Sequence, residues 1–363
     1  MTMSDQYMKA ARLHKIGQFQ VDEIPVPVPH GDELLVKIGA CGVCGSDLPR
    51  IYQHGTSNRH YPMVIGHEFS GQIVAVGETA DPSLVDRRGA FYPLIPCRAC
   101  DSCLSGHYAM CEDYDYMGSR RDGGFAQYCL VPGKWHFVES KNPHISYEML
   151  AMMEPACVAQ HAVLRKSGMF AGANVVIFGA GPIGIMAGRW ARIAGAGHIL
   201  LVDVVEEKCA FAREKGLDAF HSAAGDIVAD VKELFDGRLA DIAIEGTGFS
   251  GGLENAIHVI KRFGTIVLLG NPAGNTTITQ NAHSQLLRKE VTINGIWNSH
   301  YGNVPINEWR YTAEMMDAGK FTCEDLISHR VGLDGLPHLI AQVKNREINI
   351  CKALYSAAED GRT

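Results

Sequence analysis

Four cysteines stand close together in the run Cys97-Arg-Ala-Cys100-Asp-Ser-Cys103, and Cys111 follows after seven further residues. A Cys-x-x-Cys step brings two sulfurs onto one ion at little loop cost, and four thiolates can surround one Zn²⁺ tetrahedrally. The alternative, a set of buried free cysteines or disulfides, is disfavoured by the repeated two-residue gap. The spacing therefore predicts a closed structural zinc site in a lobe over about residues 92–116.

A second, more scattered set of residues could also bind a metal. Cys44 lies in Gly-Val-Cys-Gly-Ser-Asp, His67-Glu68 lies in Gly-His-Glu-Phe-Ser-Gly, and Glu154 precedes a proline. Each has an ordinary alternative alone: a buried cysteine, a core histidine or a surface carboxylate. Together they offer the sulfur, imidazole and carboxylate ligands of a zinc site that keeps one position open for substrate. Asp47 would then be a partner that orients His67.

The segment Gly179-Ala-Gly181-Pro182-Ile183-Gly184 follows an apolar run, Val175–Phe178, and opens a helical segment. In this context the glycines permit a tight turn, close approach of a pyrophosphate and close packing of helix on strand. The helix N-terminus would stabilise the phosphate charge. This pattern predicts a dinucleotide site.

The next apolar run ends in Asp203, about 20 residues after the glycine motif, where a carboxylate can accept hydrogen bonds from both ribose hydroxyls. A carboxylate would repel the extra phosphate of NADP, and no arginine follows it closely, so NAD is the expected cofactor. Lys208 would add a ribose contact, with a solvated helix charge as the alternative. Further cofactor contacts are predicted at Thr247, Leu269 and Asn271.

Two different patterns of predicted secondary structure, one before and one after about residue 172, position these residues. The first ~150 residues give short extended runs with turn residues between them, namely 21–25, 33–38, 73–77 and 125–130, which indicates a partly open β-barrel-like domain. From about residue 172, apolar runs at 175–178, 199–202, 242–244 and 265–269 alternate with helical segments at 183–194, 206–215 and 253–261. This alternation predicts a doubly wound parallel sheet. After residue 297 we expect one helix, 308–318, and a final strand near 350–354.

Composition narrows the class of protein. The 363 residues, 46% hydrophobic and 20% charged, favour two domains of an ordinary globular protein. A net charge of −7 with no basic block argues against nucleic-acid and anionic-membrane partners. Residues 1–20 do not have the pattern of a signal peptide. Eleven cysteines, several in ligand-like clusters, favour a reducing cytoplasm over a disulfide framework.

Taken together, the motifs resemble those of the zinc-dependent medium-chain dehydrogenases, the alcohol and polyol dehydrogenase family. Over essentially the whole chain, Cys44-Gly-Ser-Asp47, Gly66-His-Glu68, the four-cysteine lobe, Glu154-Pro155 and the dinucleotide motif stand in the family's order. Longer strings are similar to the polyol dehydrogenase branch: Cys44-Gly-Ser-Asp-Leu-Pro-Arg50, Gly118-Ser-Arg-Arg-Asp-Gly-Gly-Phe125, Leu287-Arg-Lys-Glu290 and Gly295-Ile-Trp297.

The resemblance implies a fold and a domain division. We expect a GroES-like, partly open β-barrel catalytic domain over 1–160 and 298–363, and a Rossmann NAD-binding domain over 161–297. It also implies two zinc ions per chain, one catalytic and one structural, and a homodimer or homotetramer. The implied reaction transfers a hydride from a secondary hydroxyl of a polyol, or of a polyol phosphate such as galactitol 1-phosphate, to NAD.

Carried over by position, the catalytic zinc would be held by Cys44, His67 and Glu154, with Glu68 as an alternating or outer ligand. The metal would lower the pKa of the substrate hydroxyl, and Ser46 would carry its proton away. Many relatives have a relay histidine where this chain has Pro49, which cannot transfer a proton. The proton would then leave through cofactor ribose and water, or through His54.

Substrate contacts are expected from Arg50, Tyr116 and Trp297. Arginines at 50, 120 and 121 could grip a phosphate by paired hydrogen bonds, or could make structural ion pairs instead. An unphosphorylated hexitol or pentitol is therefore the alternative substrate. A more distant alternative is a zinc-ribbon protein in which the nucleotide domain acts as a sensor, and a third is a zinc-free quinone reductase of the same fold.

Overall fold

The chain consists of two compact units. The computed structural model describes residues 7–58, 60–222, 225–272 and 274–361. Unit 1 joins the residues up to Pro155 to those from His300 onward, and unit 2 runs from Ala156 to Ser299. Residues 156–160 and 298–299, which the resemblance assigned to the catalytic domain, lie in unit 2.

The strands of unit 2 have the spatial order β13-β12-β11-β14-β15-β16 and pair in parallel. They are β11 (Asn174–Phe178), β12 (His198–Asp203), β13 (Asp218–His221), β14 (Ala240–Glu245), β15 (Ile260–Leu268) and β16 (Thr292–Gly295). All residues of β11 are buried, as expected of a central parallel strand with both faces covered.

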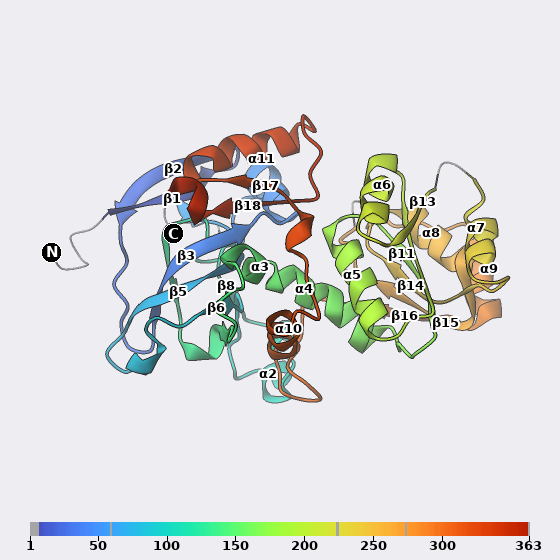
Figure 1. The fold of residues 1–363 in the computed structure, drawn as a ribbon, viewed down its shortest axis with the longest axis horizontal. Helices are drawn as coiled ribbons and strands as arrows, with labels where there is room; N and C mark the ends of the chain where they lie inside the picture. The colour runs from blue at the N-terminus through green and yellow to red at the C-terminus, as the bar shows by residue number, and fades with distance from the viewer. Residues whose placement is uncertain (1–6, 59, 223–224, 273, 362–363) are drawn as a thin grey trace. The chain divides into compact units, whose positions relative to one another are not determined.

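Helices cover both faces of this sheet (Figure 1). They are α5 (Pro182–Ile193), α6 (Glu206–Glu214), α7 (Ile227–Leu234), α8 (Ser250–Val259) and α9 (Gln280–Lys289). Helices α5 and α6 pack against β11, β12 and β13, whereas α8 and α9 pack against β14 and β15. The expected doubly wound sheet is confirmed. The predicted helix 253–261 is too long at its end, because Ile260 already begins β15.

Unit 1 contains a larger mixed sheet with the order β10-β6-β5-β3-β18-β17, and β9 pairs with β3. Its strands are β3 (Leu34–Gly42), β5 (Glu68–Val76), β6 (Arg88–Phe91), β9 (Tyr128–Val131), β10 (Phe137–Glu139), β17 (Ile327–Val331) and β18 (Lys352–Ser356). A smaller sheet joins β1 (Tyr7–Lys15), β2 (Gln18–Pro25) and β4 (Met63–Val64), and β7 (Leu94–Ile95) pairs with β8 (Asp115–Tyr116).

Unit 1 also contains helices. They are α1 (Asp47–Pro49), α2 (Asp101–Leu104), α3 (Tyr147–Ala151), α10 (Glu308–Asp317) and α11 (Leu336–Lys344), while α4 (Met153–Gln160) runs across the boundary between the units. The expected single C-terminal helix and single strand were incomplete, because α11 and β17 are also present. None of the helices in the described parts of the chain is both long and apolar enough to cross a membrane.

Strand β3 is central to unit 1 because it pairs with β5, β9 and β18. Its apolar side chains, including Leu34, Val36 and Ile38, belong to the buried core of the unit. At its carboxyl end, Gly42 is paired with Glu68 on one side and with Leu354 on the other. The strand therefore delivers the loop with Cys44 next to the start of β5 and close to β18.

Candidate active site

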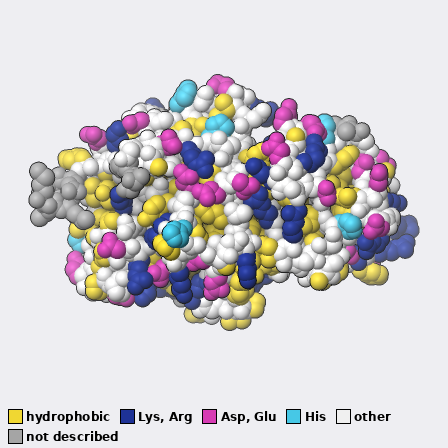
Figure 2. All heavy atoms as spheres, in the orientation of Figure 1, with side chains coloured by type: hydrophobic (Ala, Val, Ile, Leu, Met, Phe, Trp, Pro, Cys, Tyr) yellow, Lys and Arg dark blue, Asp and Glu magenta, His cyan; other side chains and the backbone are white. Residues whose placement is uncertain are grey.

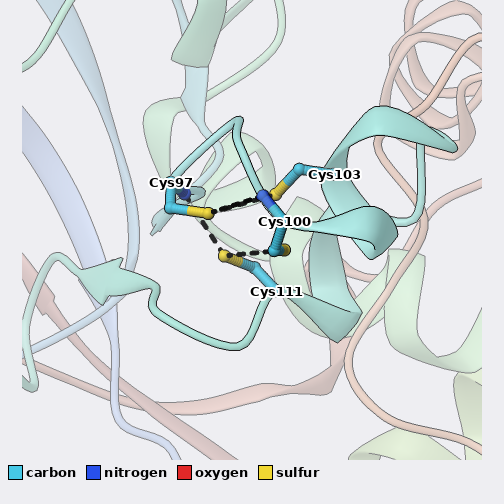
Figure 3. A group of neighbouring side chains, drawn as sticks. All are labelled: Cys97, Cys100, Cys103 and Cys111. Carbon is cyan, nitrogen blue, oxygen red and sulfur yellow. Dashed lines mark hydrogen bonds between the residues drawn. The ribbon is translucent and has the colours of Figure 1, made fainter.

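The four lobe cysteines converge, as Figure 3 shows. Their sulfur atoms all lie within 4.8 Å of one another, and none of the four is in a disulfide. The Sγ–Sγ distance is 3.9 Å between Cys97 and Cys103 and 4.0 Å between Cys100 and Cys111. Zinc–sulfur bonds of 2.3 Å in a tetrahedron require sulfur atoms about 3.8 Å apart. The lobe therefore fits one zinc ion with four thiolate ligands.

Backbone amides support the same interpretation. The amides of Ala99 and Cys100 each donate to Cys97 Sγ at 3.4 Å, and the amide of Cys97 donates to Cys111 Sγ at 3.2 Å. Hydrogen bonds of this kind stabilise negative charge on sulfur, which is the form that binds metal. Because all four ligand positions come from cysteine, such a site leaves no position for a substrate.

A second group consists of Cys44, His67 and Glu68, whose ligand atoms also lie within 4.8 Å of one another. His67 and Glu68 are buried, and Cys44 is half-buried. Among the described residues, no group of this kind includes Glu154. Glu154 is nevertheless buried, and its carboxylate interacts electrostatically with His67 and Glu68. Sulfur, imidazole and carboxylate donors fit a zinc site with an open position.

The Asp47 carboxylate contacts several residues in and beside this group. It is fully buried, and its Oδ2 accepts a hydrogen bond from the Cys44 amide at 2.9 Å. Its Oδ1 accepts one from Arg50 Nη1 at 2.8 Å and lies 3.5 Å from His67 Nδ1. With Nδ1 facing this carboxylate, Nε2 would be the ring nitrogen of His67 that is available to a metal. The predicted orienting role of Asp47 thus has a geometric basis.

Glycines shape the turn that carries His67. Gly66 has a φ of +94°, and a Cβ there would collide with Phe125 and with Cys41. A Cβ on Gly118 or Gly123 would collide with the carbonyl oxygen of Gly66, to which the Gly124 amide donates at 2.8 Å. The glycines of the 118–125 string are therefore needed because this string packs against the backbone of the turn that carries His67.

Sequence reasoning missed Lys352. Its ammonium forms a buried ion pair with Glu68 Oε2, with side-chain exposures of 5% and 2%. A Cβ on Gly42 would collide with the same carboxylate oxygen. The glycine therefore leaves the space that this ion pair fills. No local pattern marks Lys352, which follows Glu68 by 284 positions.

Burial and neighbouring charges shift the pKa values in this group. Burial raises the pKa of Glu154 to about 7, an effect that Glu68 adds to and His67 opposes. Burial acts to lower the pKa of His67, but Asp47 and Cys44 outweigh it and raise that pKa well above its ordinary value. Burial likewise opposes the charge of Lys352, yet Glu68 raises its pKa. These buried charges therefore stabilise one another.

In unit 2, the glycine motif forms the turn between β11 and α5. Gly179 has a φ of +105°, and a Cβ on Gly184 would collide with the Gly179 carbonyl oxygen. Gly181 caps α5, and Pro182 occupies its first turn, where the missing amide hydrogen costs nothing. Ile183 follows in the same turn of α5. The backbone thus has the close packing and the open helix N-terminus that a pyrophosphate needs.

Asp203 ends β12 beside this turn. Its Oδ2 accepts from the Ala180 amide at 2.9 Å, and its Oδ1 accepts from the Val205 amide at 3.0 Å. Lys208 Nζ lies 4.0 Å from Asp203 Oδ2, so the lysine is near the carboxylate but half-exposed. The carboxylate is therefore fixed at the carboxyl end of the sheet, where ligands of open α/β folds bind.

The remaining predicted cofactor residues lie at the same edge. A Cβ on Gly179 would touch the Thr247 methyl group at 3.6 Å, and one on Gly246 would touch Leu269 at 3.7 Å. The Asn271 carbonyl oxygen approaches Gly248, which has a φ of +71°. Sequence reasoning missed Glu245, whose carboxylate accepts from the Thr247 hydroxyl and from the amides of Thr247 and Gly248. That carboxylate holds the loop in place.

The residues expected to relay the proton or to contact the substrate differ in their burial and in their neighbours. Ser46 precedes α1 and is half-buried, and His54 is exposed at the end of the turn that follows. Tyr116 packs edge-on against the His67 ring, with centroids 5.8 Å apart. Arg50 is engaged by Asp47. Trp297 lies in unit 2 and is 51% exposed.

The two arginines of the 118–125 string are also engaged. The Arg120 guanidinium lies 4.0 Å from the centre of the Tyr114 ring and donates to the Tyr114 carbonyl. Arg121 forms an exposed ion pair with Asp115, with Nε 2.7 Å from Oδ2. Both arginines thus already interact with protein groups, which favours the alternative that they make structural contacts over the alternative that they bind a substrate phosphate.

Comparisons with known proteins define the class. Residues 30–141 match the model of the alcohol dehydrogenase GroES-like domain, and residues 182–318 match that of the zinc-binding dehydrogenases. The chain is 35% identical to galactitol 1-phosphate 5-dehydrogenase of Escherichia coli over 332 residues, 90% of this chain and 94% of that protein. It is 33% identical to a sorbitol dehydrogenase of Bacillus subtilis over 275 residues, 74% and 77% of the two chains.

Solved structures agree. A crystal structure of galactitol-1-phosphate dehydrogenase from Escherichia coli superposes with a TM-score of 0.88, at 32% identity, over 96% of this chain and 100% of that chain. A zinc-binding dehydrogenase from Sinorhizobium meliloti, bound to NADP, gives a TM-score of 0.86 at 28% identity, over 97% and 100%.

The fold and both matched models define an oxidoreductase with a GroES-like domain and a Rossmann domain. More narrowly, the chain belongs to the zinc-dependent medium-chain dehydrogenases, the alcohol and polyol dehydrogenase family. The interpretation as an enzyme is thereby confirmed over the zinc-ribbon alternative.

Proposed function

We propose that this chain oxidises a secondary hydroxyl of a polyol phosphate, similar to galactitol 1-phosphate, to the ketone and passes the hydride to NAD. The observation that carries the substrate class is the similarity to galactitol 1-phosphate 5-dehydrogenase over nine-tenths of the chain. The converging Cys44, His67 and Glu68 supply a centre for the chemistry. Asp203 supports NAD over NADP, because a carboxylate at the end of the second strand, beside the glycine turn, would repel the extra phosphate of NADP.

The residues divide the work. Cys44 and His67 would hold a catalytic zinc together with Glu68 or Glu154, and the four lobe cysteines would hold a second, structural zinc. When bound, zinc lowers the pKa of a nearby hydroxyl, and the nicotinamide ring accepts a hydride. Ser46 takes the hydroxyl proton, which leaves through water, ribose or His54. The products are a ketose phosphate, NADH and one proton.

An unphosphorylated hexitol or pentitol is the second candidate substrate. It is favoured by the partners of Arg50, Arg120 and Arg121, since each guanidinium already engages a carboxylate or an aromatic ring. The sorbitol dehydrogenase of Bacillus subtilis is an identified relative. We further propose a cytoplasmic homodimer or homotetramer that acts without nucleic-acid or membrane partners.

A substrate screen tests the proposal. NADH production is measured with galactitol 1-phosphate, sorbitol 6-phosphate, galactitol, sorbitol, xylitol and threonine, each also with NADP in place of NAD. We expect the highest kcat/KM with a polyol phosphate and NAD, and two zinc ions per chain by elemental analysis. A higher kcat/KM with free hexitols or pentitols would establish the second candidate, and activity with threonine alone would refute both.

A further inference from the structure

A hollow of about 650 Å³ opens at the edge of unit 2 that faces away from the dinucleotide motif. Asn174 and Asp241 lie in its wall at the amino ends of β11 and β14, and Lys261 lies there near the start of β15. Because the strands are parallel, Gly179 and Asp203 lie at the opposite, carboxyl edge. The hollow is therefore distinct from the dinucleotide site.

The wall of the hollow is strongly basic. It contains Arg238, Lys261, Arg262, Arg288 and Lys289 against the single carboxylate of Asp241, which gives a formal charge of +4 (5 − 1). The chain as a whole has a net charge of −7, so the charge of the hollow is opposite in sign to that of the whole chain. Figure 2 shows Lys and Arg side chains gathered where Figure 1 labels α9 and β15. We call this site the basic hollow.

Several of these groups are held in place by the fold. Asp241 accepts a hydrogen bond from the Asn174 amide at 2.8 Å and forms an ion pair with Lys261. Lys289 Nζ donates to the carbonyl oxygens of Ile257 and His258, which anchors its ammonium at the end of α8. The positive charges are thus partly preorganised, which lowers the cost of binding an anion.

Two further observations point to a ligand. Asn174, one of the residues that line the hollow, is 1% exposed, and its Oδ1 is buried with no hydrogen-bond partner in the described part of the chain. A buried polar atom of this kind calls for a partner. Phe263, directly after Arg262, has a φ of +59°, and such strain in a non-glycine residue collects at functional sites.

We propose that the basic hollow binds a small phosphate-bearing anion. Arginine and lysine donate strong hydrogen bonds to phosphate oxygens. The volume of about 650 Å³ lies within the range of sites for small metabolites, so a phosphorylated metabolite fits as well as the free ion.

The test is a calorimetric titration of inorganic phosphate into the zinc-loaded, full-length protein. The protein is first saturated with whichever of NADH or NADPH it binds more tightly, and sodium chloride of equal ionic strength is the blank. The variant is R262Q/R288Q, in which two exposed arginines lose their charge. The matched control is Lys232→Gln, which removes an exposed charge from α7 in the same unit but outside the hollow.

We expect saturable binding that is about tenfold or more weaker in R262Q/R288Q and unchanged in the control, because one charge-assisted hydrogen bond accounts for about one decade. Arg288→Lys should retain most of the affinity. Equal affinity in R262Q/R288Q and the wild type overturns the proposal, and so does loss of binding when the dinucleotide site is filled. The substrate screen does not depend on this result, so the two proposals can fail separately.

Discussion

Replacing Lys352 by methionine should destabilise unit 1 because it leaves the Glu68 carboxylate buried without its cation. Both side chains are almost completely buried, with exposures of 5% and 2%. Removal of one partner from a buried ion pair costs about 3–5 kcal/mol, since the desolvated charge that remains has lost its compensation. We therefore expect the free energy of unfolding of Lys352→Met to fall by about 3–5 kcal/mol.

The assay is urea unfolding followed by tryptophan fluorescence, with the same free zinc concentration for every variant. Lys9→Met is the matched control, because Lys9 and Asp334 also form a lysine–carboxylate ion pair, but an exposed one. Loss of this exposed pair should not shift the midpoint measurably. The double variant E68Q/K352M removes both charges and should recover a large part of the loss. A midpoint for Lys352→Met as close to wild type as that of Lys9→Met would refute the reasoning.

Three further predictions concern other parts of the chain. Asp203→Gly should weaken discrimination against NADP by about 1–3 kcal/mol, the range for a lost charge-assisted hydrogen bond, in the ratio of kcat/KM for NAD and NADP; an unchanged ratio contradicts the cofactor proposal. Cys97→Ser should remove one zinc ion per chain and lower the thermal midpoint before it affects kcat, whereas Cys351→Ser, outside both clusters, should retain two ions by elemental analysis. Burial lowers the pKa of His136 to about 4 from an ordinary 6.5, so its stabilising contribution is present above pH 6.5 and is lost as the pH falls toward 4. When the pH falls from 6.5 to 4, the free energy of unfolding of His136→Gln should therefore drop by about 3 kcal/mol less than that of the wild type. Urea unfolding at each pH measures this difference, and the control His60→Gln, at an exposed position, should behave as the wild type does.

The features that could be predicted from the sequence are those whose residues are near neighbours along the chain. The four lobe cysteines span fifteen positions, so spacing alone indicates a shared ion. The turn at Gly179 and the carboxylate of Asp203 belong to one strand–helix–strand unit, and its hydrophobic pattern is strong. For such features local geometry almost determines the contact.

The contacts that sequence reasoning missed join distant segments. Lys352 reaches Glu68 only because β18 and β5 flank β3, and nothing in the composition of either segment records that pairing. Helix α11 is a different case, because its signal was present. Leu336, Leu339, Ile340 and Val343 have helical spacing, with a proline in the first turn.

The order in which the chain is synthesised separates the two candidate metal-ligand groups in time. The lobe has all four of its cysteines as soon as Cys111 emerges, whereas the ion pair of Glu68 waits for Lys352, behind the whole of unit 2. At about 5–20 residues per second, the 284 positions between them take roughly 15–60 s. For that interval Glu68 is without the lysine cation with which it later forms an ion pair, so the four cysteines of the lobe can come together before the centre of unit 1 is complete.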